Sequence, residues 1–264
     1  MSHELKTLNS VWNGIYESFG AAGGDQPAFE SERWIRGQKE KILAKYQQLN
    51  NKSLTSSSIT NDYPLALVVA TLFASQAQVS VLDFGGGMGY EYLNILAKVP
   101  LAEQGLLYSI VEGAQTIAHL PAEIHTLDKL SFFTNLDDVT SHFDMVHVGS
   151  TLQYVDDWQG LLHRLIDIAD ATFFVFSDLL AGDIPTFITR QYYYGSHIPM
   201  RFLNHQDIIH CMQKLGFEAL YKAKYNPRPA LGYYPNEGLP ETHRLTHHEH
   251  WIFIKTKPSL KNNL

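Results

Sequence analysis

A glycine-rich segment at residues 81–89, VLDFGGGMG, most narrows the folds open to this chain. It follows an apolar run that predicts a strand over 79–84, and it precedes a segment that predicts a helix over about 90–98. Gly85, Gly87 and Gly89 allow the backbone to turn sharply and to approach a ligand closely. The sequence therefore predicts a ligand-binding turn between a buried strand and a helix.

Two common phosphate-binding turns are excluded by their spacing. A dinucleotide fold requires a third glycine in G-x-G-x-x-G, but Tyr90 or Tyr92 stands at that position, depending on the starting glycine. A P-loop requires a lysine directly after its last glycine, whereas Gly89 is followed by a tyrosine. What fits is an acidic residue, Asp83, at the end of the strand, followed by G-x-G-x-G.

Strand and helix patterns alternate along the rest of the chain. Further strands are predicted at 106–111, 130–134, 143–148, 171–176, 217–223 and 250–256, and further helices at 31–49, 64–74, 158–169 and between Asn204 and Gly216. Apolar strands that alternate with helices imply a mostly parallel sheet covered on both faces. We therefore expect an α/β fold.

Three stretches exceed what such a core needs. Residues 50–62 are polar, so they predict a boundary between an N-terminal helical arm or lid, 1–60, and the main domain, 61–264. Within that domain, 178–203 and 224–247 are long, tyrosine-rich inserts that we expect to have no regular structure of their own. Their tyrosines either bind an acceptor or pack a long loop or a homodimer interface.

Three elements, in order, resemble the class I S-adenosylmethionine-dependent methyltransferases: the Asp83 glycine motif, Glu112 after the second strand, and the segment 143–154. The resemblance implies a Rossmann-like fold with a seven-stranded, mostly parallel sheet whose last strand is antiparallel. It implies S-adenosyl-L-methionine as the cofactor, with Glu112 on the ribose and Asn135 on the adenine. The cofactor-binding residues that it implies are Asp83, Gly85, Gly87, Gly89, Glu112, Asn135, Ser150 and Gln153.

A looser resemblance covers most of the chain. Segments 12–19, 34–38 and 187–191 look like a methyltransferase family of bacterial surface-polysaccharide gene clusters. This resemblance implies O-methylation of a sugar or small-molecule hydroxyl in polysaccharide biosynthesis. Two alternatives stay open: N- or carboxyl-methylation of a small molecule, and a partner protein that binds S-adenosylmethionine without catalysis.

A hydroxyl acceptor benefits from a general base, and the candidates are Asp178, directly after the fifth strand, and His197 in the first insert. His147 lies in the middle of a strand and is interpreted as a buried, hydrogen-bonded histidine. Gln191, Tyr192 and Arg201 are the candidate substrate-binding residues. The cluster His243, His247, His248 and His250 has no clear third ligand for a metal, so we expect no metal site.

Net charge and composition limit the classes of molecule that the chain is expected to bind. The chain has 20 Lys+Arg against 27 Asp+Glu, a formal charge of −7, which disfavours nucleic acid and anionic membranes. One cysteine excludes an internal disulfide. The longest apolar stretch, 65–74, is too short to span a bilayer, and the first residues lack a signal-peptide pattern. We expect a cytoplasmic protein that acts on a small-molecule or sugar acceptor.

Overall fold

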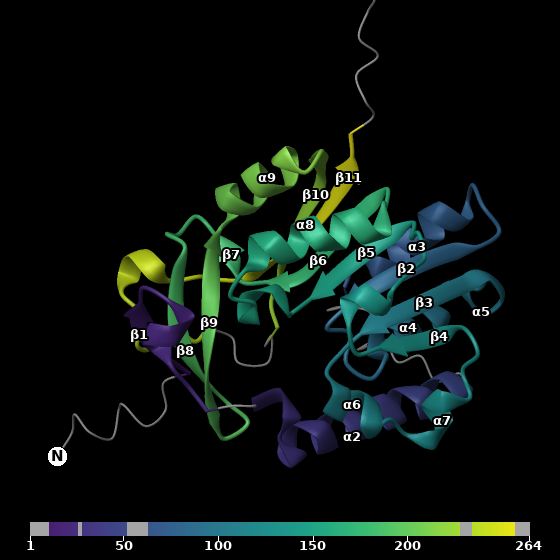
Figure 1. The fold of residues 1–264 in the computed structure, drawn as a ribbon, viewed down its shortest axis with the longest axis horizontal. Helices are drawn as coiled ribbons and strands as arrows, with labels where there is room; N and C mark the ends of the chain where they lie inside the picture. Colours follow the sequence, from purple (N-terminus) through teal and green to yellow (C-terminus); the bar gives the residue numbers. More distant parts are fainter. Residues whose placement is uncertain (1–10, 26–27, 52–62, 228–233, 257–264) are drawn as a thin grey trace, which may run out of the picture.

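The computed structural model describes residues 11–25, 28–51, 63–227 and 234–256. Their strands form a seven-stranded sheet and a four-stranded sheet (Figure 1). The smaller sheet stands at one end of the larger one, on the left of the view. The functional cavities described below lie between the larger sheet, the smaller sheet and helix α2.

The larger sheet has the strand order β10-β11-β6-β5-β2-β3-β4. Its strands are β2 (Val79–Phe84), β3 (Leu106–Val111), β4 (Leu130–Phe133), β5 (Met145–Gly149), β6 (Phe173–Leu179), β10 (Phe217–Tyr225) and β11 (His248–Lys255). β2 pairs in parallel with β3 and β5, whereas β11 is antiparallel to both β6 and β10. The predicted sheet of seven strands, mostly parallel with the last strand antiparallel, is confirmed.

Helices cover both faces of this sheet. On one face α2 (Glu32–Asn50), α3 (Leu65–Phe73) and α4 (Tyr90–Leu96) share an apolar core with Val79 and Val81 of β2. On the other face α8 (Trp158–Ala169) and α9 (His205–Lys214) share a core with Leu82. Successive strand residues point to opposite faces, so β2 must be apolar on both. The connections contain α1 (Phe19–Ala22), α5 (Ala102–Gly105), α6 (Ala114–Ala118), α7 (Ala122–His125) and the 3-10 helices η2 (Ala28–Glu30), η4 (Leu136–Asp138), η5 (Leu152–Tyr154) and η7 (Glu241–His243).

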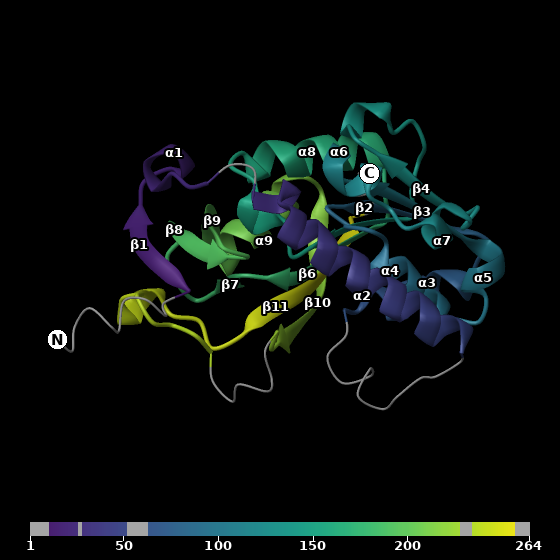
Figure 2. The same ribbon diagram turned by 90° about the horizontal axis from the view of Figure 1, so that it is seen from below.

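The N-terminal region is only partly helical. The predicted helix at 31–49 is present as α2 and begins after Ser31, whose hydroxyl accepts a hydrogen bond from the Trp34 N–H. Trp12–Tyr16, by contrast, forms the strand β1, which pairs with β8. Figure 2 shows α2 lying lengthwise beside α3 and α4, with β1 at the far end of the molecule. The predicted boundary at 50–62 lies mostly outside the described residues, so the division into arm and domain stays a prediction.

The expectation that 178–203 has no regular structure is wrong. This stretch forms β7 (Ala181–Gly182), β8 (Phe187–Tyr193) and β9 (Ser196–Asn204), and the smaller sheet has the order β1-β8-β9-β7. β8 and β9 are a hairpin whose turn, Tyr194 and Gly195, has φ values of 50° and 90°. Two positive φ values match the right-handed twist of paired strands. The second predicted insert, 224–247, falls partly outside the described residues.

Candidate active site

A cavity of about 650 Å³, called the large cavity below, opens where the parallel strands of the main sheet end. In open α/β sheets ligands bind beyond the carboxyl ends of the strands, because the loops there diverge. The large cavity is lined by residues in or just after the last residues of β2, β3, β5 and β6, and by Trp34, Gln38 and Lys41 of α2. Helix α2 therefore forms part of its wall.

The glycine turn brings bare backbone to this cavity. Gly85 and Gly87 have φ values of 75° and 59°, the left-handed region that glycine tolerates. A Cβ atom on Gly85 would lie less than 3.0 Å from the side chain of Thr151, which follows β5. The turn is therefore closely packed against the neighbouring loop at Gly85.

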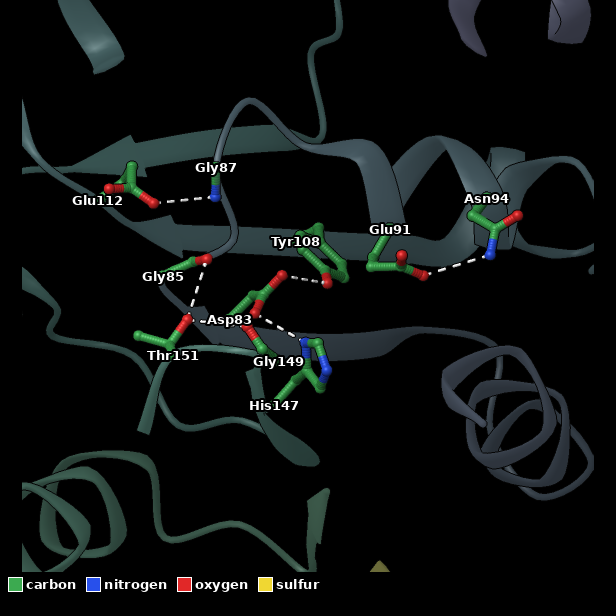
Figure 3. A network of polar contacts seen from close by, with 10 residues as sticks. All are labelled: Asp83, Gly85, Gly87, Glu91, Asn94, Tyr108, Glu112, His147, Gly149 and Thr151. Carbon is green, nitrogen blue, oxygen red and sulfur yellow. Dashed lines mark hydrogen bonds and ion pairs between the residues drawn. The ribbon is translucent and has the colours of Figure 1, made fainter. Parts of the chain in front are cut away.

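Glu112 connects the end of β3 to the glycine turn. Its Oε2 accepts a hydrogen bond of 3.0 Å from the Gly87 N–H (Figure 3). Its Oε1 accepts one of 2.7 Å from the Gly113 N–H. Burial raises the pKa of this carboxyl, while the two backbone donors act against the rise. Glu112 lines the large cavity and keeps lone pairs free for a ligand.

Asp83 lies beneath the turn and is fully buried. Its Oδ2 accepts a hydrogen bond of 2.7 Å from the Tyr108 hydroxyl, and its Oδ1 lies 2.7 Å from Nδ1 of His147 (Figure 3). His147 is buried as predicted, but only Nδ1 is hydrogen-bonded: its Nε2 has no partner among the described residues. His147 lines the large cavity, and its Nε2 is a buried polar atom in the cavity wall.

A second cavity of about 170 Å³, the small cavity, adjoins the first. The two share five lining residues: Ser150, Tyr154, Asp178, Tyr193 and Pro227. The small cavity also reaches Trp12 of β1 and Gln191 of β8, so the smaller sheet forms its outer wall. Two ligands, one in each cavity, would therefore be in contact beside Asp178.

Asp178 is held there by a strained backbone and a hydrogen-bonded histidine. Its φ is 55°, and its Oδ1 forms a short hydrogen bond with Nδ1 of His248, at the start of β11. Nε2 of His248 lies 2.6 Å from the Tyr234 hydroxyl. All three side chains line the small cavity. They form a continuous chain, Asp178–His248–Tyr234, that we call the Asp–His–Tyr chain.

The neighbouring His250 stays neutral. Burial lowers the pKa of its imidazole to about 4, and its Nδ1 accepts a hydrogen bond of 3.2 Å from the Asp178 N–H. A neutral ring can accept at Nδ1, so the two observations agree. His250 therefore fixes the backbone of Asp178 and adds no positive charge.

Most of the sequence-predicted site residues meet at the two cavities. The large cavity is lined by Asp83, Gly85, Gly87, Glu112, Ser150 and Asp178, and the small cavity by Ser150, Gln153, Asp178 and Gln191. Gln153 is buried, and its Oε1 has no hydrogen-bond partner in the part of the chain that the structure describes. The predicted residues outside both cavities are Gly89, Asn135, Tyr192, His197 and Arg201.

The structure does not bring His197 to Asp178. Its ring lies near the tip of the β8–β9 hairpin, 3.7 Å from the carboxylate of Asp25, and its side chain is 45% exposed. Tyr192 is also exposed, because it points to the opposite face of β8 from Gln191. Asn135 caps η4 by accepting a hydrogen bond from the Asp137 N–H. The histidine beside Asp178 is His248.

Arg201 has a structural role in place of the predicted substrate contact. Its guanidinium donates hydrogen bonds of 2.8 and 2.9 Å to the carbonyls of Val155 and Asp156, and its centre lies 4.9 Å from the Phe19 ring. These contacts fix the chain after η5, which carries Tyr154 into the cavity junction. The side chain is almost completely buried.

Replacing Arg201 with alanine is expected to lower the free energy of unfolding by about 1–3 kcal/mol, because two partly buried carbonyls lose a charged donor and the buried stem of the side chain is removed. Arg201→Lys should recover little, since one ammonium cannot reproduce the fork of the guanidinium. Urea denaturation monitored by circular dichroism measures the change. A loss below about 0.5 kcal/mol for Arg201→Ala would contradict this role.

Several lining residues were not predicted from the sequence. Lys41 and Glu91 belong to this group, as does Tyr63, whose hydroxyl donates to Asp178 Oδ2 at 3.4 Å. His248 and His250 were considered only as metal ligands. The described residues contain no group of three or more side chains that could hold a metal ion. None of the helices among them is long and apolar enough to cross a membrane.

Comparison with known proteins supports a common family and fold. Residues 55–222, more than half of the chain, match the model of a family described as a methyltransferase domain. No curated protein sequence gives a significant match. One similar solved structure is the 1,6-didemethyltoxoflavin-N1-methyltransferase of Burkholderia thailandensis, with bound 1,6-didemethyltoxoflavin and S-adenosylhomocysteine: 15% identity, TM-score 0.53, 88% of this chain and 93% of that chain covered.

Another similar structure is magnesium protoporphyrin IX methyltransferase from Synechocystis PCC 6803, with bound SAH. It is 14% identical, has a TM-score of 0.50, and the alignment covers 86% of this chain and 96% of that chain. At such identities the likeness shows a shared fold.

Proposed function

This chain belongs to the methyltransferase domain family, and we propose that it uses S-adenosylmethionine to methylate a hydroxyl group of a neutral small molecule or sugar. The observation that carries the proposal is the junction of the two cavities at Asp178. A cofactor in the large cavity and an acceptor in the small one would meet beside a hydrogen-bonded carboxylate–histidine pair.

The large cavity fits this cofactor in size and chemistry. Its volume of about 650 Å³ lies in the usual range for cofactor sites. The side-chain-free backbone at Gly85 and Gly87 leaves room for the cofactor, and the Glu112 carboxylate can accept hydrogen bonds from two neighbouring ribose hydroxyls. The adenosine would lie toward Glu112, and the reactive sulfur toward Asp178.

The small cavity favours a neutral, hydroxyl-rich acceptor. Its described lining contains neither lysine nor arginine, so nothing there would neutralise a phosphate or carboxylate. Trp12, Tyr154 and Tyr193 offer flat apolar faces, which suit the faces of a sugar ring. The unpartnered Oε1 of Gln153 can accept a hydrogen bond from an acceptor hydroxyl. These features support a sugar acceptor, and the sequence resemblance suggests surface-polysaccharide biosynthesis as its source.

S-adenosylmethionine supplies a methyl group on a positively charged sulfur, which an acceptor oxygen takes by in-line displacement while the C–S electron pair stays on sulfur. The chain's own contribution is to position the acceptor and remove its proton. In the proposed route the acceptor O–H donates to the Tyr234 oxygen, whose own proton passes to Nε2 of His248. Asp178, on Nδ1, stabilises the imidazolium that results.

The test separates this function from its alternatives. Calorimetry should detect binding of S-adenosylhomocysteine. Mass spectrometry then follows methyl transfer from trideuteromethyl S-adenosylmethionine to panels of neutral glycosides, amines and carboxylic acids. Transfer to glycosides only supports the proposal. Transfer to amines that survives Asp178→Asn together with His248→Gln indicates an N-methyltransferase, whereas binding without transfer to any acceptor indicates a non-catalytic partner protein.

A further inference from the structure

We propose that Lys41 of α2 and Glu91 of α4 bind the two charges of the cofactor's amino-acid tail, Lys41 its carboxylate and Glu91 its ammonium group. The inference rests on the proposed function, since it takes S-adenosylmethionine as the cofactor. Both side chains line the large cavity. Neither was identified from the sequence, and both lie beside the glycine turn.

Lys41 is placed by the orientation of α2. Trp34, Gln38 and Lys41 follow one another at helical spacing and all line the large cavity. Gln38 lies directly over the turn, with its Oε1 3.5 Å from the position that a Cβ atom on Gly87 would take. Nζ of Lys41 lies 4.1 Å from the centre of the Tyr90 ring, at the start of α4. Lys41 is the only lysine or arginine among the described lining residues, so it is the available partner for a carboxylate.

Glu91 is placed by a chain of hydrogen bonds that joins α4 to α2. Nδ2 of Asn94 donates to Oε2 of Glu91 at 3.2 Å (Figure 3), and Nζ of Lys45 donates to Oδ1 of Asn94 at 2.8 Å. Lys45 and Asn94 are buried, so they hold the carboxylate in one orientation. Within the described part of the chain Glu91 has no ion pair within 4.0 Å.

The other carboxylates of the large cavity have different partners, or lie on the ribose side of the proposed cofactor. Asp83 accepts from Tyr108 and contacts His147, Asp178 pairs with His248, and Glu112 accepts two backbone N–H groups on the far side of the turn. Burial raises the pKa of Glu91, and His147, the hydrogen bond from Asn94 and Lys41 offset this rise only in part. A bound ammonium group would add a further positive charge that favours the ionised carboxylate. The cofactor tail is a zwitterion, and Lys41 and Glu91 match it charge for charge.

The test compares two ligands that differ in the tail. S-adenosylhomocysteine carries the amino-acid tail, whereas 5′-methylthioadenosine keeps the adenosine and the sulfur without it. By calorimetry, Lys41→Gln and Glu91→Gln should each lower the affinity for S-adenosylhomocysteine about 10- to 100-fold. Each should change the affinity for 5′-methylthioadenosine by less than about twofold. Lys39→Gln, an exposed lysine of α2 outside the cavity, is the matched control and should change neither.

The outcomes are distinguishable. Equal losses for both ligands, or no loss for either, would overturn the tail assignment and leave the adenosine site standing. Failure of both ligands to bind the unsubstituted protein would overturn the proposed function itself. Lys45→Met tests a residue that holds Glu91 in place without contacting the ligand. It should lower the affinity for S-adenosylhomocysteine less than Glu91→Gln does, because Lys45 acts through Asn94.

Two further measurements separate a binding role from a structural one. The titratable groups that face Glu91 are Lys41 and Lys45 on α2, Asp83 on β2 and His147 on β5, together with four tyrosine hydroxyls: Tyr63, Tyr90, Tyr108 and Tyr225. A raised pKa in the free protein means that affinity for S-adenosylhomocysteine should rise with pH until Glu91 is fully ionised and then level off, with protons released on binding. Glu91→Gln should flatten this rise. It should also reduce the number of protons released on binding, since the group that loses the proton is gone. Proton release that persists unchanged in Glu91→Gln would contradict the inference.

Discussion

Exchange of His248 for glutamine is expected to lower kcat for methyl transfer to a hydroxyl acceptor by about 10²–10⁴-fold, the usual contribution of a positioned base. Nδ1 of His248 is bonded to Asp178 and its Nε2 to Tyr234, so glutamine keeps much of the volume and loses the proton acceptor. Affinity for S-adenosylhomocysteine and the KM of the acceptor should change less than about threefold. Steady-state kinetics with the acceptor found by the panel measures both.

The chain offers a matched control and two companion variants. His197→Gln removes a histidine that lies in neither cavity, so its kcat should stay within about twofold of the unsubstituted enzyme. Tyr234→Phe and Asp178→Asn interrupt the same Asp–His–Tyr chain, so each should lower kcat, and combining either with His248→Gln should add little. Full activity of His248→Gln, or a loss on His197→Gln as large, would contradict this assignment.

The second large effect concerns the glycine turn. Gly85→Ala is expected to lower the free energy of unfolding by about 2–5 kcal/mol. It should also lower the affinity for S-adenosylhomocysteine at least 100-fold. The left-handed φ of 75° costs energy for any residue with a Cβ, and the new Cβ would overlap the side chain of Thr151. The Thr151 side chain cannot move aside freely, because its hydroxyl bonds to the Gly149 carbonyl at 2.8 Å. Displacing the turn would also break the contact between Gly87 and Glu112.

Gly113→Ala is the matched control for this change. Gly113 lies at the same edge of the sheet, its φ is −59°, and a Cβ atom there would meet nothing within 4 Å. Thermal denaturation and calorimetry of both variants make the comparison. Comparable effects at Gly85 and Gly113 would mean that the packing of the turn is not the cause.

Local sequence determined the main sheet and the cofactor side of the site. The apolar runs predict all the strands of the larger sheet, and Asp83 and Glu112 are recognised because they stand at the carboxyl ends of parallel strands, where ligands bind in open α/β sheets. What the pattern could not predict is how Asp83 is used. Tyr108 and His147 occupy its two oxygens, and only the pairing of three strands brings those side chains together.

The acceptor side depended on contacts between distant parts of the chain. Alternation along the last strand places His248 and His250 on one face, but nothing local indicates that this face meets Asp178. The tyrosine-rich composition of 178–203 favours a loop, but Phe187, Ile188 and Thr189 have high strand propensity and Gly195 suits a hairpin turn. Lys41 and Glu91 gave no signal, since charged residues on helices are ordinarily solvated.

The pairing of β1 with β8 affects the order in which the two cavities form as the chain folds. Trp12 enters the small cavity's wall, pairs with Gln191 across the strands and donates a hydrogen bond of 2.6 Å to the carbonyl of Pro235, 223 residues away. β1 is therefore made well before the segment that holds Trp12 in place. Closing so long a loop is slow relative to local folding. The large cavity can assemble mainly from neighbouring parallel strands, whereas the small cavity must wait for the segment around Pro235 and His248, so during synthesis the small cavity forms after the large one.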